Sequence, residues 1–406
     1  MPPRPHVLFL TSDQLRADAL GAYRAGDSLT DDRGGTVAVN ATTPHLNALA
    51  QRGVRFSNAF TAAPECVPAR ATWLTSRYPA VHGAMNNGMA RRPLRAPSLY
   101  RAAADAGYVV AMLGKTHYQP ALTEDDRVSV MWHYVVSNAT SAEDRWRAPN
   151  RTMDTTLEGV LVKAFAGFLG YQAHEAPHRP WFVHLSFVNP HPPIDCARLP
   201  RGRSNLHWTR STPPLVQADE LQGNERFGGN VTLYQRDWRR RRRCYGATVE
   251  YVDSMAGRAL ALVDLATTLV VFTSDHGDML GAHGIAQKSV FYEAAWRVPL
   301  LVAGPGVPRG RVDGGFACGV DVPATLRAAM RARGSELGVD LRSGAARTGC
   351  PGWMGADLQA YVNATEKRVY KNGRLVQRFA RPGDPDELEN LALTTTSTRD
   401  YPPTAN

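Results

Sequence analysis

The chain has 406 residues, of which 43% are hydrophobic and 21% charged, so it can form one large domain, with or without a small second one. This composition excludes intrinsic disorder, collagen and small disulfide-rich scaffolds, and no apolar run approaches the about 18 residues of a membrane-spanning helix. The formal charge is +10, from 47 Lys and Arg against 37 Asp and Glu. Only five of the 47 are Lys, so we attribute most of the surplus to an arginine-rich composition.

Short apolar runs rich in β-branched residues alternate with helical patterns, which is typical of an α/β fold with a large, mostly parallel sheet flanked by helices. The runs are continuous, as expected for strands that are buried on both faces. In chain order, the pattern first predicts a strand over 6–11, helices over 45–52 and 98–106, and a strand over 108–113. A loop over 136–157, a strand over 181–188 and a loop over 195–235 follow. The pattern then predicts a helix over 248–265, strands over 268–274 and 299–303, and a helix over 322–332.

The last part of the chain has a different pattern. Two short β-rich runs, 368–370 and 375–379, flank the turn sequence Lys371-Asn372-Gly373, which predicts a β-hairpin. We therefore expect a large α/β domain over 1–335 and a small, mainly antiparallel subdomain over 336–406.

Cysteines and glycosylation sequons bear on the cellular compartment. None of the five Cys forms a CxxC pair, which argues against a structural zinc site, and four remain for two disulfides if Cys66 is set aside for chemistry. The number of glycosylation sequons favours a secretory-pathway protein, lysosomal or extracellular, whereas the N-terminus shows no signal peptide. Either the chain is a mature or truncated form, which we favour, or the sequons are incidental. The candidate glycosylation sites are five N-x-T sequons, at Asn40, Asn138, Asn150, Asn230 and Asn363.

Polar or titratable side chains follow four of the five predicted strands. Ligands of open α/β sheets bind at the carboxyl ends of the strands, so we expect these side chains to converge on one site. They are Asp13 and Gln14 after the first strand, Lys115 and His117 after the second, His191 after the third, and Asp275 and His276 after the fourth.

Two subsets of these residues indicate specific chemistry. The oxygen atoms and imidazole of Asp13, Gln14, Asp275 and His276 suit a divalent cation, with Ca²⁺ favoured and Mg²⁺ or Mn²⁺ as alternatives. Lys115 and Lys288 remain lysine in an arginine-rich chain, which indicates a need for a compact, movable cation that binds an oxyanion.

Cys66-Val-Pro68-Ala-Arg70 opens an apolar helical run over 71–74. A Cys at a helix N-terminus has a lowered thiol pKa and faces amide donors, and Arg70 lies one turn further on the same face. The pattern indicates a nucleophile in an anion-binding site. The alternative is a Cys that simply packs at the start of a helix.

The motif Cys66-x-Pro68-x-Arg70-x-x-x-Leu74-Thr75 resembles the signature of type I sulfatases, in the alkaline phosphatase superfamily. The resemblance covers nearly the whole chain. In order, the matching segments are Asp13-Gln14, Thr43-Pro44-His45-Leu46-Asn47-x-Leu49-Ala50-x-x-Gly53, Arg77-Tyr78-Pro79-x-x-His82-Gly83, Gly114-Lys115-x-His117, Asn189-Pro-His191-Pro-Pro, Asp275-His276-Gly277, Lys288, Arg297-Val-Pro-Leu, Gly304-Pro-Gly306 and an acidic tail over 384–392.

This resemblance implies hydrolysis of an anionic sulfate monoester, either a small aryl or alkyl sulfate or a carbohydrate sulfate. A formylglycine-generating enzyme would oxidise Cys66 to formylglycine, whose hydrate attacks the sulfur and then expels sulfate. The resemblance also implies a role for each site residue. The cation is held, together with residue 66, by Asp13, Gln14, Asp275 and His276, and Asp275 also acts as base. The hydrate is oriented by Arg70, Lys115 and His117. The sulfate is contacted by Lys288 and His191, one of which protonates the leaving alcohol, and Asn87 offers a substrate-side polar group.

Three departures from the family pattern leave alternatives open. Gln14 replaces the second Asp of many sulfatases, as in phosphonate and phosphate diester hydrolases of the same superfamily. Ser76 replaces a Gly that often follows Leu-Thr, and the chain is shorter than most relatives. The alternatives are a phosphonate or phosphate ester hydrolase on the same site, and a non-catalytic sulfoglycan-binding protein with unmodified Cys66.

The five consecutive Arg over 239–243 predict a solvated helix start, with a docking patch for a sulfated glycan as the alternative. No nucleic-acid-reading motif accompanies them, so we expect no nucleic-acid partner. Substrate specificity is expected to lie in the loops over 118–160 and 195–245.

Overall fold

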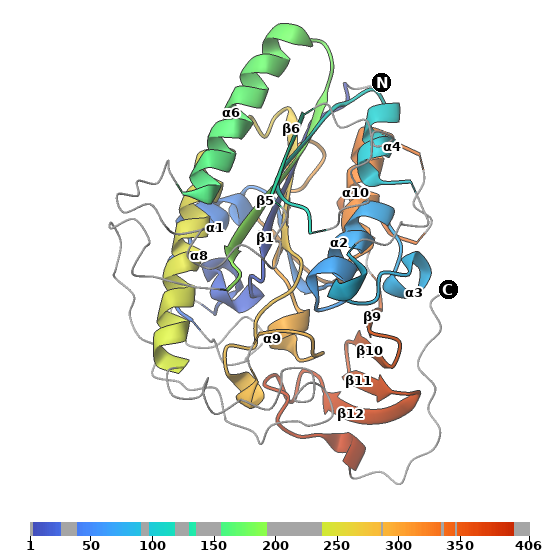
Figure 1. Ribbon diagram of the computed structural model, residues 1–406. Coiled ribbons are helices and arrows are strands. Elements are labelled where there is room, and N and C mark those ends of the chain that lie inside the picture. Colours follow the sequence, from blue (N-terminus) through green and yellow to red (C-terminus); the bar gives the residue numbers. More distant parts are fainter. Residues whose placement is uncertain are drawn as a thin grey trace.

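The computed structural model describes residues 3–25, 39–90, 97–117, 130–134, 156–192, 238–285, 287–333, 337–345 and 347–393. Its main sheet consists of β1 (His6–Asp13), β2 (Val54–Phe60), β3 (Val109–Lys115), β4 (Val130–Tyr134), β5 (Trp181–Pro190), β6 (Thr268–Ser274), β7 (Leu300–Ala303) and β8 (Arg311–Cys318). The eight strands have the order β4-β3-β5-β1-β6-β7-β2-β8, and helices cover both faces of the sheet (Figure 1). This arrangement confirms the predicted α/β fold, and each predicted strand lies within two residues of an observed one.

The sheet is parallel except at β7, which runs antiparallel to both β6 and β2. The apolar run over 299–303 does not by itself reveal this direction. A parallel connection needs a long crossover, usually a helix that packs on the sheet. Between β6 and β7 the described chain has only the short helices Ala282–Gly284 and α9 (Glu293–Trp296), so it turns over the end of the sheet and comes back antiparallel.

Two helical layers bury the sheet. On one face lie α1 (Pro44–Gln51), α6 (Leu157–Glu175) and α8 (Trp238–Leu260), and on the other lie α2 (Cys66–Thr75), α4 (Leu99–Asp105) and α10 (Asp321–Met330) (Figure 1). Each layer has its own hydrophobic core against the strands. Among the described residues, no helix has the length and apolar character needed to cross a membrane.

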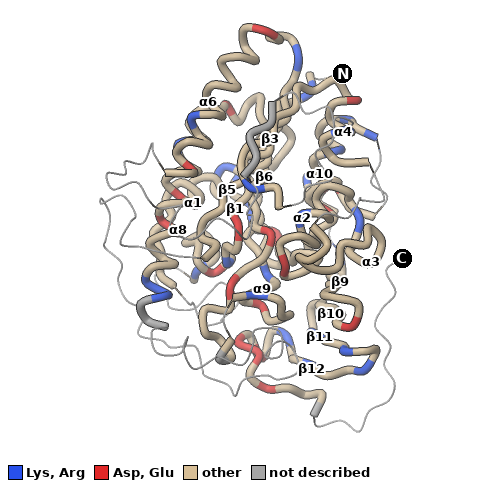
Figure 2. Tube along the Cα trace, viewed as in Figure 1, with Lys and Arg blue, Asp and Glu red and all other residues tan. Residues whose placement is uncertain are grey.

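Three of the predicted helices are confirmed. Helices α1, α4 and α10 lie within two residues of their predicted ranges, and Ser98 caps α4 by accepting a hydrogen bond from the backbone N–H of Arg101. Helix α8 differs from the prediction because it begins at Trp238, ten residues early, and ends at Leu260. The arginine run is therefore inside the helix, visible as a blue band near one end of α8 (Figure 2). Arginine is a good helix former, and Nε of Arg242 donates to the carbonyl of Leu280 at 2.9 Å.

A second, antiparallel sheet follows, with β9 (Gly349–Met354), β10 (Leu358–Asn363), β11 (Glu366–Lys371) and β12 (Arg374–Ala380) in the order β12-β11-β10-β9. The predicted hairpin is confirmed as β11 and β12, and its turn places Asn372 and Gly373 at positive φ (51° and 73°). The prediction missed β9 and β10, because Gly349, Pro351 and Gly352 interrupt the apolar pattern of β9.

The two sheets are joined covalently and by packing. A disulfide links Cys318, the last residue of β8, to Cys350 in β9, and Phe60, Trp296 and Trp353 belong to one core cluster that spans the junction. Cys244 also takes part in a disulfide, and Cys66 is the free cysteine of the described residues. Cys196 lies outside the described residues.

Replacing both Cys318 and Cys350 by alanine is expected to lower the free energy of unfolding by about 3–4 kcal/mol. The bond closes a loop of sequence separation 32, and its loss increases the entropy of the unfolded chain by that much. Urea titration followed by tryptophan fluorescence measures the change, with the slope of the transition as a check on two-state behaviour. A difference below about 1 kcal/mol would show that the junction is held by packing alone.

Candidate active site

The predicted convergence at the strand ends is present in the structure. Strands β3, β5, β1 and β6 are consecutive neighbours and parallel, so their carboxyl ends lie at the same edge. Lys115 and Asp13 are the last residues of β3 and β1, whereas His191 and Asp275 directly follow β5 and β6. Acidic and basic segments accordingly lie together where these strands end, between the two helical layers (Figure 2).

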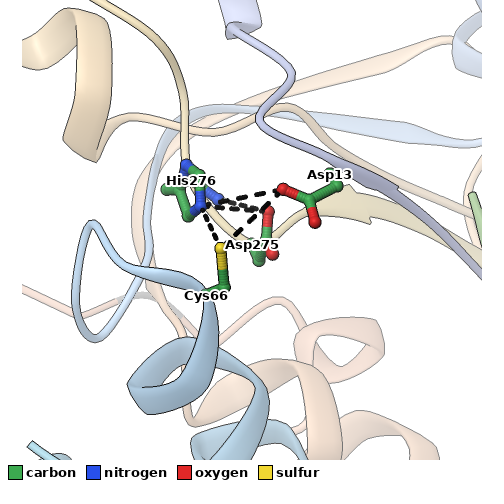
Figure 3. A group of neighbouring side chains, drawn as sticks. All are labelled: Asp13, Cys66, Asp275 and His276. Atoms are coloured by element: carbon green, nitrogen blue, oxygen red, sulfur yellow. Dashed lines mark hydrogen bonds and ion pairs between the residues drawn. The ribbon is translucent and has the colours of Figure 1, made fainter. Parts of the chain in front are cut away.

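Four side chains at this edge form a compact group of potential metal ligands: Asp13, Cys66, Asp275 and His276 (Figure 3). Their ligand atoms all lie within 4.8 Å of one another, and all four residues are fully buried. Sγ of Cys66 is 3.2 Å from Nε2 of His276 and 4.0 Å from Oδ1 of Asp13. Metal–ligand bonds of about 2.0–2.5 Å place neighbouring donor atoms about 3–4 Å apart, so one cation fits among them.

The surrounding backbone fixes the ligand orientations. Nδ1 of His276 lies 2.9 Å from the carbonyl oxygen of Gly277 and donates to it, so the lone pair of Nε2 faces the cluster. Oδ1 of Asp275 accepts hydrogen bonds from the backbone N–H groups of Gln14 and His276, both at 3.0 Å. Gln14 itself has φ 64°, a left-handed conformation that is uncommon outside glycine and is often found at functional sites.

Cys66 is the first residue of α2, a helix whose ten residues are all buried. Oδ1 of Asn87 accepts from the N–H of Val67 at 2.9 Å, so Asn87 caps this helix beside Cys66. The helix ends at Ser76, which has φ 60° and ψ 27°. This left-handed position explains why glycine suits it, and here Oγ of Ser76 accepts from Nε of Arg327 at 3.1 Å.

Two lysines approach the thiol. Nζ of Lys288 lies 3.2 Å from Sγ of Cys66, and Nζ of Lys115 lies 3.9 Å from it and donates to Oδ2 of Asp13. Burial opposes the charge of Lys288, but Cys66, Asp13 and Asp275 outweigh burial and raise the pKa of Lys288. Both lysines therefore place positive charge beside residue 66.

Arg70 joins the two carboxylates from the next turn of α2. Its Nε donates to Oδ2 of Asp275 at 2.8 Å, and its NH2 group lies 3.4 Å from Oδ2 of Asp13. Its NH1 group donates to the carbonyl of Lys115 at 2.8 Å and to Oγ of Ser186 at 3.0 Å. Ser186 was missed by the sequence interpretation, because a serine inside an apolar strand gives no signal of this contact.

The positively charged side chains of the site lower the pKa values of Cys66 and Asp13. Burial raises the pKa of the Cys66 thiol, but Lys115 and Lys288 outweigh burial and hold that pKa well below its usual value. Burial and Cys66 also oppose ionisation of Asp13, yet its pKa is lowered because the charges of Lys115 and Arg70 outweigh them. The site thus stabilises negative charge at residue 66.

Two histidines, His117 and His191, lie near the thiol, and each is electrostatically linked to Cys66. Burial, together with Lys288 and Lys115, lowers the pKa of His191 to about 4, so the imidazole is neutral at pH 7. His117 has φ 52°, and its buried Nδ1 has no hydrogen-bond partner among the described residues. His117 therefore offers an open polar atom beside the thiol.

Asp278 was also missed, although it follows the Asp275-His276-Gly277 motif directly. It is buried, and its carboxylate accepts a hydrogen bond from the side-chain amide of Gln14.

Of the sequons, Asn40 and Asn363 are partly buried, and Oδ1 of Asn363 accepts from the N–H groups of Thr365 and Glu366. The remaining sequons, Asn138, Asn150 and Asn230, and most of the expected specificity loops lie outside the described residues.

Comparison with known proteins bears on this site. The family model "Sulfatase" matches residues 5–332. A choline-sulfatase of Rhizobium meliloti (strain 1021) is 29% identical over 306 residues, which cover 66% of this chain and 59% of that protein. An arylsulfatase of Clostridium perfringens (strain 13 / Type A) is 24% identical over 348 residues, which cover 75% of this chain and 69% of that protein.

Among solved structures, the phosphonate monoester hydrolase of Agrobacterium radiobacter superposes with a TM-score of 0.75 and 25% identity. The superposition covers 96% of this chain and 92% of that chain. The fold is therefore shared over nearly its full length.

Proposed function

The chain belongs to the sulfatase family, and from this we propose that it hydrolyses a sulfate monoester with formylglycine, made from Cys66, as the nucleophile. The observation that carries the proposal is the placement of Cys66 at a buried helix start, among two carboxylates, an imidazole and three cationic side chains. Formylglycine supplies, once hydrated, one hydroxyl that can attack sulfur and a second that allows sulfate to be expelled.

A divalent cation fits the ligand group. Asp13, Asp275 and His276 would hold it together with residue 66 and Oε1 of Gln14. With an oxygen in place of the sulfur of Cys66, the set is oxygen-rich, which favours Ca²⁺, with Mg²⁺ or Mn²⁺ as alternatives. When bound, the cation supplies positive charge that lowers the energy of an oxyanion at residue 66.

The neighbouring side chains would orient the reactants. Arg70 pairs with Asp13 and Asp275 and holds them in place, and Lys115 and His117 approach residue 66 from the end of β3. Lys288 would bind a sulfate oxygen as an ammonium ion. Proton transfer to the leaving alcohol would come from Lys288 or from His191 through its N–H.

A second candidate function is hydrolysis of phosphonate or phosphate esters on the same site. Two observations support it: Gln14 removes a ligand charge, and the fold superposes on a phosphonate monoester hydrolase.

Turnover of matched aryl sulfate and aryl phosphonate monoesters separates the two candidates. We expect kcat/KM for the sulfate to exceed that for the phosphonate by at least about tenfold, roughly 1.4 kcal/mol in transition-state stabilisation. Chelation should remove activity, and Ca²⁺ should restore it. Clear phosphonate cleavage without sulfate release would overturn our first candidate and support the second.

We further propose that the protein matures in the secretory pathway, where a formylglycine-generating enzyme acts on it and Asn40 and Asn363 receive glycans. The disulfide between Cys318 and Cys350 supports maturation in an oxidising compartment.

We also propose a catalytic unit over 1–335 and a smaller unit over 336–406, since the family match ends at residue 332 and the second sheet begins at Gly349.

A further inference from the structure

The side-chain amide of Gln14 bridges two oppositely charged groups. Its Nε2 donates to Oδ2 of Asp278 at 2.6 Å, and its Oε1 accepts from Nζ of Lys288 at 2.8 Å. Lys288 in turn lies 3.2 Å from Sγ of Cys66. A continuous line of contacts thus runs from Asp278 through Gln14 and Lys288 to the reactive residue.

Both neighbours impose the same orientation on this amide. An ammonium group can only donate hydrogen bonds, so the side of Gln14 that faces Lys288 must be the oxygen. The oxygens of Asp278 accept from Gln14 and from the N–H of Leu280 at 2.8 Å, so the side that faces Asp278 must be the NH₂ group. The orientation of Gln14 is therefore set by Asp278 as much as by Lys288.

Asp278 is held rigidly in place. Arg16 donates from its NH1 group to the backbone carbonyl of Asp278 at 2.7 Å, and Arg242 holds the carbonyl of Leu280. The backbone carbonyl of Gln14 accepts from the hydroxyl of Tyr245 at 2.7 Å. Neither end of the contact between Gln14 and Asp278 can shift without breaking these bonds.

The pairing explains why position 14 carries an amide. A carboxylate there would turn an acceptor oxygen toward the oxygens of Asp278 at hydrogen-bond distance, with no donor between them. Gln14 thus offers a donor to Asp278 and an acceptor to Lys288, which a carboxylate cannot do. Lys288 keeps a neutral acceptor, which leaves its charge available to an anion.

We propose that Asp278 is a positioning residue that, through Gln14, presents an amide oxygen to Lys288 and to the cation site, so that the acceptor Lys288 meets at position 14 is neutral and its ammonium can bind an anionic ester. The part that concerns the ester rests on the proposed function. The part that concerns the cation rests on the proposed metal site, whereas the orientation of Gln14 by Asp278 rests on neither.

Exchange of the two side chains tests the proposal. D278N and Q14E each keep the shape of the side chain, and Q14E/D278N restores the hydrogen bond with donor and acceptor exchanged. The thermal midpoint, the Ca²⁺ dissociation constant and KM for an aryl sulfate are measured on each purified protein. D264N, in the exposed turn before β6, is the matched Asp→Asn control and should change none of them.

We expect both single variants to lose thermal stability and the double variant to recover more than half of the summed loss. In D278N the one remaining side-chain oxygen accepts from the N–H of Leu280, so the new NH₂ group faces the NH₂ of Gln14. The amide of Gln14 can then turn, and the Ca²⁺ dissociation constant should rise by about 10–100-fold. In the double variant Ca²⁺ binding should return, but KM should stay raised about tenfold because the carboxylate introduced at position 14 pairs with Lys288.

Additive losses of stability would overturn the coupling, and an unchanged Ca²⁺ dissociation constant in D278N would overturn the positioning role. If D278N does not fold, folding of the double variant decides, since only a coupled pair would rescue it. If the wild type releases no sulfate but the stability cycle is coupled, the proposed function fails and the pairing stands. If the wild type releases sulfate but the losses are additive, the pairing fails and the proposed function stands.

Discussion

Replacing Cys66 by alanine is expected to lower kcat/KM for an aryl sulfate by about 10⁴-fold or more, roughly 5.5 kcal/mol of transition-state stabilisation. The variant removes the nucleophile and keeps Asp13, Asp275 and His276 for the cation. Calcium binding should therefore weaken far less than activity, and isothermal titration alongside steady-state kinetics measures both.

The C66S variant and peptide mass spectrometry give sharper versions of this test. Serine offers a hydroxyl that can be sulfated but cannot eliminate the sulfate, so C66S should release at most one alcohol per protein and then stop. In the active wild type, the peptide with residue 66 should have lost one sulfur and two hydrogens and gained one oxygen. Only thiol in protein made alongside a competent modifying enzyme, with sulfated glycans still bound, would support the non-catalytic binding protein instead.

Replacing Lys288 by methionine is expected to lower kcat/KM for the sulfate ester by about 10³-fold. Methionine keeps the length of the buried stem but removes the ammonium that lies 3.2 Å from Sγ of Cys66. The loss should appear in both kcat and KM if Lys288 binds the ester in the ground state and in the transition state.

Two further lysine variants serve as controls for K288M, one that keeps the charge at position 288 and one at a surface lysine. K288R restores the charge but brings a planar fork that needs more room, so it should recover only part of the activity. K163M, on the exposed surface of α6, should behave as wild type. Near-normal activity of K288M would remove Lys288 from the proposed site and leave His191 as the candidate proton donor.

The site was predictable from the sequence to the extent that strand ends carry it. Asp13, Lys115, His191 and Asp275 each end or directly follow an apolar run, and parallel strands bring such positions to one edge whatever the loops between them. The scarcity of lysine added information, because Lys115 and Lys288 are both buried beside the thiol.

The rest depended on tertiary contacts that leave no local pattern. The direction of β7 follows from the lack of a long crossover helix after β6 in the described chain, and a short apolar run has the same pattern in either direction. Ser186 and Asp278 act through single hydrogen bonds to Arg70 and Gln14, which come from distant parts of the chain. The start of α8 was misplaced because its polar first turns lack an apolar stripe.

Burial of the motif around residue 66 has a consequence for the biosynthesis of the protein. Cys66 has no exposed surface, Arg70 is 2% exposed, and Pro68 between them is buried as well. An enzyme that reads these three side chains can reach them only while the chain is still open. Conversion and folding would then compete in time on the nascent polypeptide, and a chain that closes first would be stable, compact and permanently inactive.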